Sequence, residues 1–104
     1  MAVVKIKFLD PKQMISMYRG GHWEQAETTR ANLKAGYYAE ESELFTVNSD
    51  SQDAADEVFD LTNNPGRQEE REEKYGRGRS LSVGDIVVVG EEQWVCLSFG
   101  WAEV

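Results

Sequence analysis

The chain has 104 residues, 40% of them hydrophobic and 11% aromatic, which is the size of one domain with enough apolar side chains to bury its own core. A single cysteine excludes an intrachain disulfide, and a formal net charge of −8 disfavours binding to nucleic-acid phosphates or to an anionic membrane. No apolar run approaches the roughly 20 residues of a membrane helix, and Lys5 and Lys7 interrupt the first apolar stretch, unlike in a signal peptide, so we expect a cytoplasmic protein.

The chain begins with the pattern of a strand. Residues 3–8 alternate between apolar and basic side chains, which is the period of a strand with one buried face. Pro11 suits a first helical position, so a short helical turn is predicted as far as Met17, ending at Gly20 and Gly21.

A first full helix is predicted over His22–Lys34, where helix-favouring residues are frequent and Gly36 follows as a stop. The residues near one face of this helix form only a thin apolar stripe: Trp23, Ala26, Arg30 and Leu33. We therefore expect the helix to lie on the surface. His22 is the only histidine of the chain, and without partner ligands or a nucleophile it indicates a surface or capping role, not a zinc site or a general base.

The clearest helix is predicted over Gln52–Thr62, after a short strand at Leu44–Val47 and a turn at Asn48–Ser51 that can cap it. One stripe of this helix is predicted to face the core: Ala54, Ala55, Val58, Phe59 and Thr62. The other stripe is acidic and is predicted to face outward: Asp53, Asp56, Glu57 and Asp60. The surrounding residues 40–73 hold twelve acidic and two basic residues, so the negative charge of the chain is concentrated here.

This row of carboxylates has three interpretations. It is a solvated face that keeps a small protein soluble, or it imitates the spacing of DNA phosphates and engages a cationic surface of a nucleic-acid-binding protein. Binding of a divalent cation is the third, but the segment lacks the glycine-punctuated D-x-D-x-D pattern of hard-metal loops. We therefore expect neither a metal site nor a cofactor.

Residues 66–78 form a charged segment after the helix stop at Asn63–Gly66. It is either a helix held by pairs such as Glu70 with Lys74, standing clear of the core, or a mobile excursion. Its basic residues and the one that follows could track a phosphate backbone, although interleaved glutamates would cancel most of their field: Arg67, Arg71, Lys74, Arg77 and Arg79.

The C-terminal part predicts a β-hairpin, with strands at Ile86–Val89 and Trp94–Phe99 joined by a turn at residues 90–92. Both faces of these strands are apolar, which is typical of central strands covered on both sides. The acidic helix would cover one face, and the first helix or the side chains of Trp94 and Trp101 the other. We predict a single α+β domain over residues 1–104, an antiparallel sheet with a central C-terminal hairpin packed against the acidic helix, and Cys96 as a small core residue.

A family resemblance rests on the same part of the chain. The segment Arg79–Val89, RSLSVGDIVVV, followed by Ser98–Trp101, SFGW, resembles the C-terminal signature of YodL-like proteins, in which an RSLSVSDV-type segment leads to a V-x-S-F-G-F ending. The helix upstream corresponds to a D-x-F-x-x-F-N-like helix of that family, and the chain departs from the pattern at Gly84, commonly Ser, and at Trp101, often Phe.

The resemblance covers the chain from Leu44 onward. It implies the kind of genetic element that encodes the protein more than any chemical activity. YodL-like proteins are encoded on phages, plasmids and integrative elements, often beside anti-restriction genes, and no catalytic residues can be carried over. A surface shared with the family would involve six residues: Arg79, Ser80, Ser82, Asp85, Ser98 and Trp101. The alternative for the serines and the aspartate is that they satisfy backbone groups at the strand entry.

The predicted function is that of a non-enzymatic accessory protein of a mobile genetic element. It would bind a macromolecular partner, such as a host nucleic-acid-binding or defence protein, through an acidic surface and these residues: Asp53, Asp56, Glu57, Asp60, Arg79 and Trp101. The alternative is a nucleic-acid-binding protein that uses basic residues and an exposed Trp94 or Trp101 for base stacking: Arg71, Lys74, Arg77 and Arg79. The sequence contains no nucleophile, base and orienting group at a spacing typical of a catalytic site, so we do not expect an enzyme. We expect either a monomer or a homodimer formed by pairing of edge strands.

Overall fold

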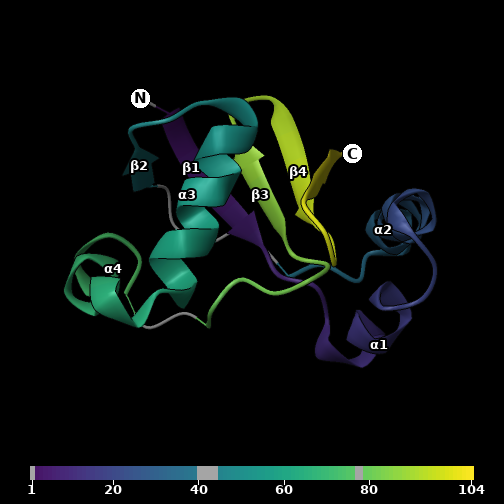
Figure 1. The fold of residues 1–104 in the computed structure, drawn as a ribbon. Helices are drawn as coiled ribbons and strands as arrows, with labels where there is room; N and C mark the ends of the chain where they lie inside the picture. The colour runs from purple at the N-terminus through teal and green to yellow at the C-terminus, as the bar shows by residue number, and fades with distance from the viewer. Residues whose placement is uncertain (1, 40–44, 77–78) are drawn as a thin grey trace.

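An antiparallel sheet of five strands forms the centre of the structure (Figure 1). The computed structural model describes residues 2–39, 45–76 and 79–104. Its strands are β1 (Ala2–Lys7), β2 (Phe45–Val47), β3 (Ile86–Val89), β4 (Glu92–Cys96) and β5 (Trp101–Glu103). They are arranged in the order β2-β1-β3-β4-β5, so β3 takes the middle position with β4 next to it. The predicted α+β class with a central C-terminal hairpin is therefore confirmed.

The helices lie on both sides of this sheet. A short 3-10 turn, η1 (Pro11–Gln13), leads into α1 (Met14–Met17), and α2 (His22–Ala35) follows. The acidic helix is α3 (Ser51–Asn63), after which come η2 (Pro65–Arg67) and α4 (Gln68–Lys74). Figure 1 shows α3 across one face of the sheet with α4 at its end, and α1 and α2 on the side of β4 and β5. No helix within the described ranges is long and apolar enough to cross a bilayer.

The register of β1 explains its alternating sequence. Val4 lies opposite Phe45 of β2 and Val89 of β3, and Ile6 lies opposite Val87. Val4 and Ile6 are fully buried, as the predicted strand with one buried face requires.

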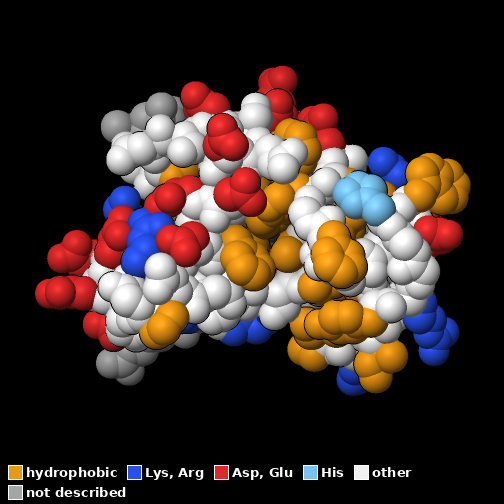
Figure 2. Space-filling model, in the orientation of Figure 1, with side chains coloured by type: hydrophobic (Ala, Val, Ile, Leu, Met, Phe, Trp, Pro, Cys, Tyr) orange, Lys and Arg blue, Asp and Glu red, His pale blue; other side chains and the backbone are white. Residues whose placement is uncertain are grey.

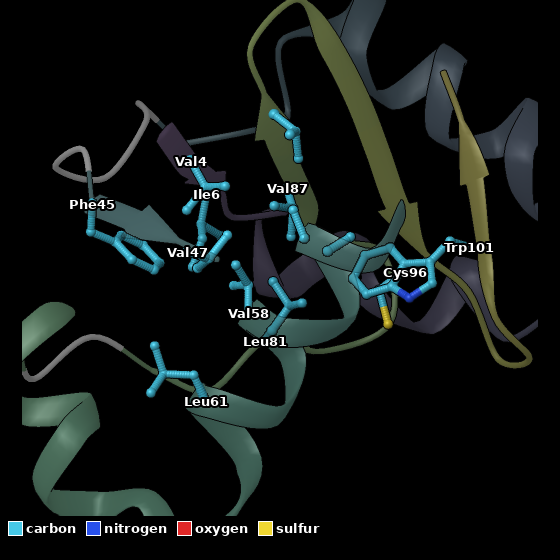
Figure 3. Packing of buried hydrophobic residues seen from close by; sticks show 13 residues of the cluster. Val4, Ile6, Phe45, Val47, Val58, Leu61, Leu81, Val87, Cys96 and Trp101 are labelled. Atoms are coloured by element: carbon cyan, nitrogen blue, oxygen red, sulfur yellow. The ribbon is translucent and has the colours of Figure 1, made fainter. Parts of the chain in front are cut away.

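The core on the α3 side is built from apolar residues of α3 and of all five strands (Figure 3). The predicted burial of Ala54, Ala55, Val58 and Thr62 is confirmed. The predicted burial of Phe59 is wrong, because its side chain is 39% exposed and Leu61 is buried instead. Leu61 lies three residues after Val58 and so continues the buried stripe of α3. Phe59 lies only one residue after Val58, which places its side chain at the edge of this stripe.

A second apolar cluster occupies the opposite face of the sheet, under α1 and α2, and it contains Met17, Ile86 and Leu97. The predicted first helix is α2, and its coverage of this face is confirmed. Trp23 takes no part in this coverage, because it is 71% exposed. The buried positions of α2 are small or polar: Gln25, Ala26, Thr29 and Asn32. The alternative cover by tryptophans is wrong, since Trp94 and Trp101 pack in the cluster on the α3 side.

The strand predicted over Trp94–Phe99 is shorter in the structure. It ends at Cys96, because residues 98–100 turn and β5 pairs back onto β4. Of the two alternatives for residues 66–78, the structure has a helix, α4, and residues 77–78 lie outside the described part of the chain. Leu44, predicted to begin a strand, also lies outside it, and β2 is described from Phe45.

Candidate functional site

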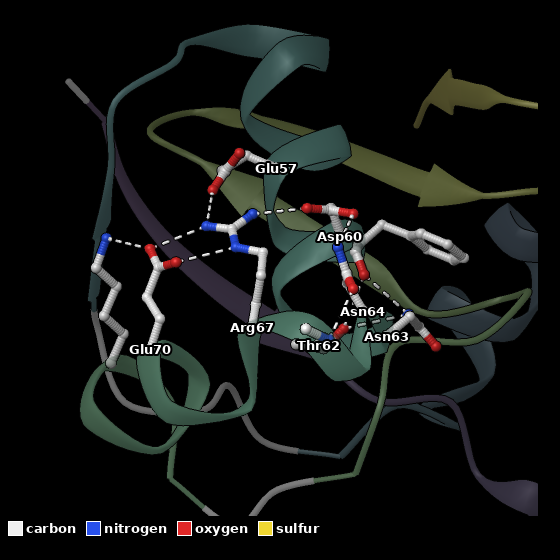
Figure 4. A network of polar contacts seen from close by, with 10 residues as sticks. Glu57, Asp60, Thr62, Asn63, Asn64, Arg67 and Glu70 are labelled. Atoms are coloured by element: carbon white, nitrogen blue, oxygen red, sulfur yellow. Dashed lines mark hydrogen bonds and ion pairs between the residues drawn. The ribbon is translucent and has the colours of Figure 1, made fainter.

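Arg67 joins α3 to α4 through three carboxylates (Figure 4). Its guanidinium donates hydrogen bonds to Glu57, to Asp60 at 2.8 Å and to Glu70 at 2.9 Å. Hydrogen bonds donated to these acids, with Glu70 first, raise the pKa of Arg67, and the bond from Arg67 lowers the pKa of Glu70. Two of the four predicted carboxylates of α3 are therefore paired within the molecule.

A third carboxylate of α3, Asp56, meets the predicted site residue Trp101. The indole Nε1–H of Trp101 donates to Oδ1 of Asp56 at 2.6 Å. Trp101 is only 9% exposed, so its ring is not available for base stacking, and Trp94, the other candidate, is partly buried. The ring of Trp101 packs into the core beside Cys96, as Figure 3 shows. Asp53, the fourth carboxylate, is exposed in the first turn of α3.

Arg79 belongs to a different part of the molecule. Its guanidinium donates to both carboxylate oxygens of Asp85, at 2.7 and 2.8 Å, and lies over the ring of Phe8. Asp85 is fully buried and also accepts hydrogen bonds from the backbone N–H of Leu9 and of Ser82. The structure thus gives Asp85 the backbone-satisfying role that the sequence offered as one alternative, and it does not bring Arg79 to the carboxylates of α3.

Arg71 and Lys74, two further basic residues of the nucleic-acid alternative, are also engaged by the protein itself, and Arg77 lies outside the described residues. Arg71 donates to the backbone carbonyl of Thr62 at 2.9 Å and lies over the ring of Tyr75. Lys74 lies 3.3 Å from the carboxylate of Glu70. With Arg79 held by Asp85, the described members of this set do not form a free basic track along which a phosphate backbone could run.

The structure shows an apolar surface that the sequence reasoning missed. Phe99 is 89% exposed in the turn between β4 and β5, and Tyr18 and Phe59 are exposed as well. Two clefts connect the three side chains: one is lined by Phe59 and Ser98, the other by Tyr18, Phe99 and Ser98. We call these three side chains and two clefts the apolar surface, and Figure 2 shows hydrophobic side chains gathered on this face of the molecule.

The turn that carries Phe99 is held firmly by its neighbours. The amide of Gln25, buried in α2, donates to Oγ of Ser98 at 2.9 Å and accepts from the backbone N–H of Ser98 at 3.2 Å. Within the turn, the N–H of Leu97 donates to the carbonyl of Gly100 at 3.0 Å, and Gly100 has a left-handed φ of 78°. Ser98 and Gly100 on either side of Phe99 are residues that favour turns, and they are the signal in the sequence that could have indicated a turn here.

One of the two clefts lies between α3 and this turn. It has a volume of about 290 Å³ and is lined by Asp56, Phe59, Val83, Cys96, Leu97, Ser98, Gly100 and Trp101. Burial raises the pKa of the Cys96 thiol to about 12, so this sulfur stays protonated at neutral pH. Cys96 acts as a small apolar wall residue here. His22 is exposed at the start of α2 and lines the neighbouring cleft with Tyr18 and Phe99.

Comparison of the chain with protein-family models, with curated proteins and with solved structures gave no match in any of the three. The resemblance to YodL-like proteins therefore remains a proposal.

Proposed function

We propose that this protein is a non-enzymatic accessory protein that binds a basic protein partner through the apolar surface and the carboxylates beside it. The observation that carries the proposal is Phe99, which is 89% exposed on a turn fixed by hydrogen bonds at both of its ends. Contiguous exposed apolar side chains are uncommon on small monomeric proteins and mark sites of interaction with other proteins. A rigid turn also presents an aromatic side chain at little entropic cost on binding.

The charge around the apolar surface supports a cationic partner. Asp56 lines one of its clefts and Asp53 lies one turn earlier on α3. The chain as a whole carries a net charge of −8, which attracts a basic protein and speeds its association. An apolar centre with a charged rim is the usual composition of an interface between two proteins.

The resemblance to YodL-like proteins supports a role for such binding in a mobile genetic element. The basic partner would then be a host protein, and a nucleic-acid-binding or defence protein has the cationic surface that the proposal requires. The internal pairing of Arg71, Lys74 and Arg79 disfavours direct binding of nucleic acid by the chain itself.

The proposal is tested by capture from nuclease-treated bacterial extract with the tagged chain and two variants. Phe99→Ser removes the exposed ring, and the double variant Asp53→Asn/Asp56→Asn removes charge without depriving Arg67 of its partners. Two matched controls alter an exposed aromatic and an exposed acid outside the apolar surface: Tyr37→Ser and Glu72→Gln.

We expect one basic protein to be captured by the wild type and by both controls, and to be lost with Phe99→Ser. The Asp53/Asp56 double variant should retain less of it, and raised salt should have the same effect. Equal capture by Phe99→Ser and the wild type would refute the proposal. A partner captured from untreated extract but not from nuclease-treated extract would refute it as well.

A further inference from the structure

We infer that the cleft between α3 and residues 98–100 binds an arginine side chain of the partner. This inference rests on the proposed function and assigns one specific contact to it. Asp56 would accept hydrogen bonds from the guanidinium, and the ring of Phe59 would cover its flat face.

The first argument is that the Asp56 carboxylate is not paired with an arginine of the described residues. Glu57, Asp60 and Asp85 each face an arginine of the chain itself. Asp56 instead accepts from the indole N–H of Trp101, a neutral donor, and among the described residues no basic side chain is paired with it. Asp56 is an exposed residue, and its negative charge lies beside an otherwise mostly apolar cleft. This combination favours a ligand with a cationic end and an apolar stem.

The second argument is the shape and chemistry of the walls. Phe59, Val83 and Leu97 provide apolar contact for the aliphatic part of a long side chain. A volume of about 290 Å³ lies at the lower limit for small-molecule pockets, which suits one side chain better than a larger ligand. The cleft also opens beside Phe99, so a partner that covers this ring would bring neighbouring side chains to the cleft.

The third argument distinguishes arginine from lysine. A guanidinium is planar and weakly hydrated, and it can stack on an aromatic ring while donating to a carboxylate. The protein already contains such an arrangement, because Arg79 lies 4.5 Å from the ring centroid of Phe8 and donates to Asp85 at 2.7 Å. Phe59 and Asp56 offer the same two kinds of contact in the cleft, without an arginine of the chain between them.

The test is an NMR titration of the ¹⁵N-labelled chain with N-acetyl-arginine amide, with the indole N–H resonance of Trp101 as the reporter. N-acetyl-citrulline amide has nearly the same shape without the charge, and N-acetyl-lysine amide has the charge without the planar group. We expect a saturable shift of the indole resonance with the arginine compound. Citrulline should bind roughly tenfold more weakly, as the loss of a charge-assisted hydrogen bond predicts, with lysine between them.

Variants connect the shift to the cleft. Asp56→Asn keeps an oxygen that accepts from the indole but removes the charge, so arginine should bind roughly tenfold more weakly to it. Asp60→Asn is the matched control, since Asp60 lies on the same helix but binds Arg67 and does not line the cleft. Equal shifts with citrulline and arginine, undiminished binding to Asp56→Asn, or the absence of a saturable shift would each overturn the inference.

The two proposals can fail separately. If the arginine compound does not bind while capture of the partner still depends on Phe99, the cleft assignment is wrong and the proposed function stands. If the arginine compound binds but no basic protein depends on Phe99, the proposed function is wrong.

Discussion

Asp85 is the residue on which most local structure depends at the entry to the hairpin. Its carboxylate accepts hydrogen bonds from the backbone N–H of Leu9 and of Ser82, and from two nitrogens of Arg79. It therefore connects the segment after β1, the loop before β3 and the segment after α4 at one buried point. The sequence placed Asp85 at a strand entry, but the contacts with Leu9 depend on chain segments 76 residues apart.

We expect Asp85→Asn to destabilise the protein by about 2–4 kcal/mol, because an amide cannot accept from all four donors and leaves Arg79 unpaired. The measurement is the free energy of unfolding in urea, with Glu72→Gln as an exposed control. A loss below about 0.5 kcal/mol, the usual range of surface substitutions, would show that Asp85 is not an essential anchor.

Gly84, next to it, has no room for a side chain. Its φ is 97°, and a Cβ would lie 2.7 Å from Cδ2 of Leu9 and 2.9 Å from Cγ of Met17. Gly84→Ser, which introduces the residue common in YodL-like proteins, should therefore cost about 2–4 kcal/mol from backbone strain and overpacking together.

Gly90→Ser serves as the matched control for this substitution. Gly90 also has a positive φ, 61°, but nothing lies within 4 Å of a Cβ built there. It should lose only the backbone contribution, about 1 kcal/mol, in the same unfolding experiment. If both substitutions cost the same, the contact of Gly84 with Leu9 and Met17 is not what excludes a side chain.

At the scale of elements, the two long helices differ in how well the sequence predicts them. The buried face of α3 is mostly apolar, so its periodicity predicts both the helix and the side it buries, apart from Phe59. The buried face of α2 includes Gln25, Thr29 and Asn32, whose burial depends on tertiary hydrogen bonds such as that of Gln25 with Ser98. The spacing of hydrophobic residues cannot indicate a buried face made of polar side chains. It placed Trp23 in the apolar stripe of the helix, whereas Trp23 is exposed in the structure.

The attachment of α4 to α3 depends on Arg67 and is therefore sensitive to pH. The bond from Arg67 lowers the pKa of Glu70 below its ordinary value of 4.5. The folded state thus favours the ionised carboxylate, and this stabilisation is complete above the ordinary pKa and is lost as the pH falls through the lowered one.

We expect Arg67→Ala to raise the pKa of Glu70 back toward its ordinary value and to speed amide hydrogen exchange in α4. The first effect is measured by an NMR titration of the side-chain carboxyl, the second by exchange at neutral pH. Arg30→Ala, which removes an exposed pair with Glu27 in α2, is the control that should leave both unchanged. An unaltered Glu70 titration in Arg67→Ala would contradict the arrangement in Figure 4.

At the scale of the whole molecule, the sequence predicted the class and the central hairpin but only part of the candidate site. Asp56 and Trp101 were both named from the sequence, yet their contact arises only because β5 brings Trp101 under α3. The exposure of Phe59 and Phe99 could not be predicted, since aromatic residues in a helix and beside a strand are normally assigned to the core. The apolar surface is thus a property of the tertiary structure.

The central claim is that this surface contacts another protein, and site-specific photo-crosslinking tests it most directly. A benzophenone amino acid is introduced in place of Phe99 in one variant and of Tyr37, an exposed aromatic outside the surface, in another. Both are irradiated in cells, and the products are identified by mass spectrometry. We predict that the variant at position 99 yields one covalent adduct with a basic protein and that the variant at position 37 does not. The absence of an adduct at position 99, or the same adducts from both positions, would contradict the account.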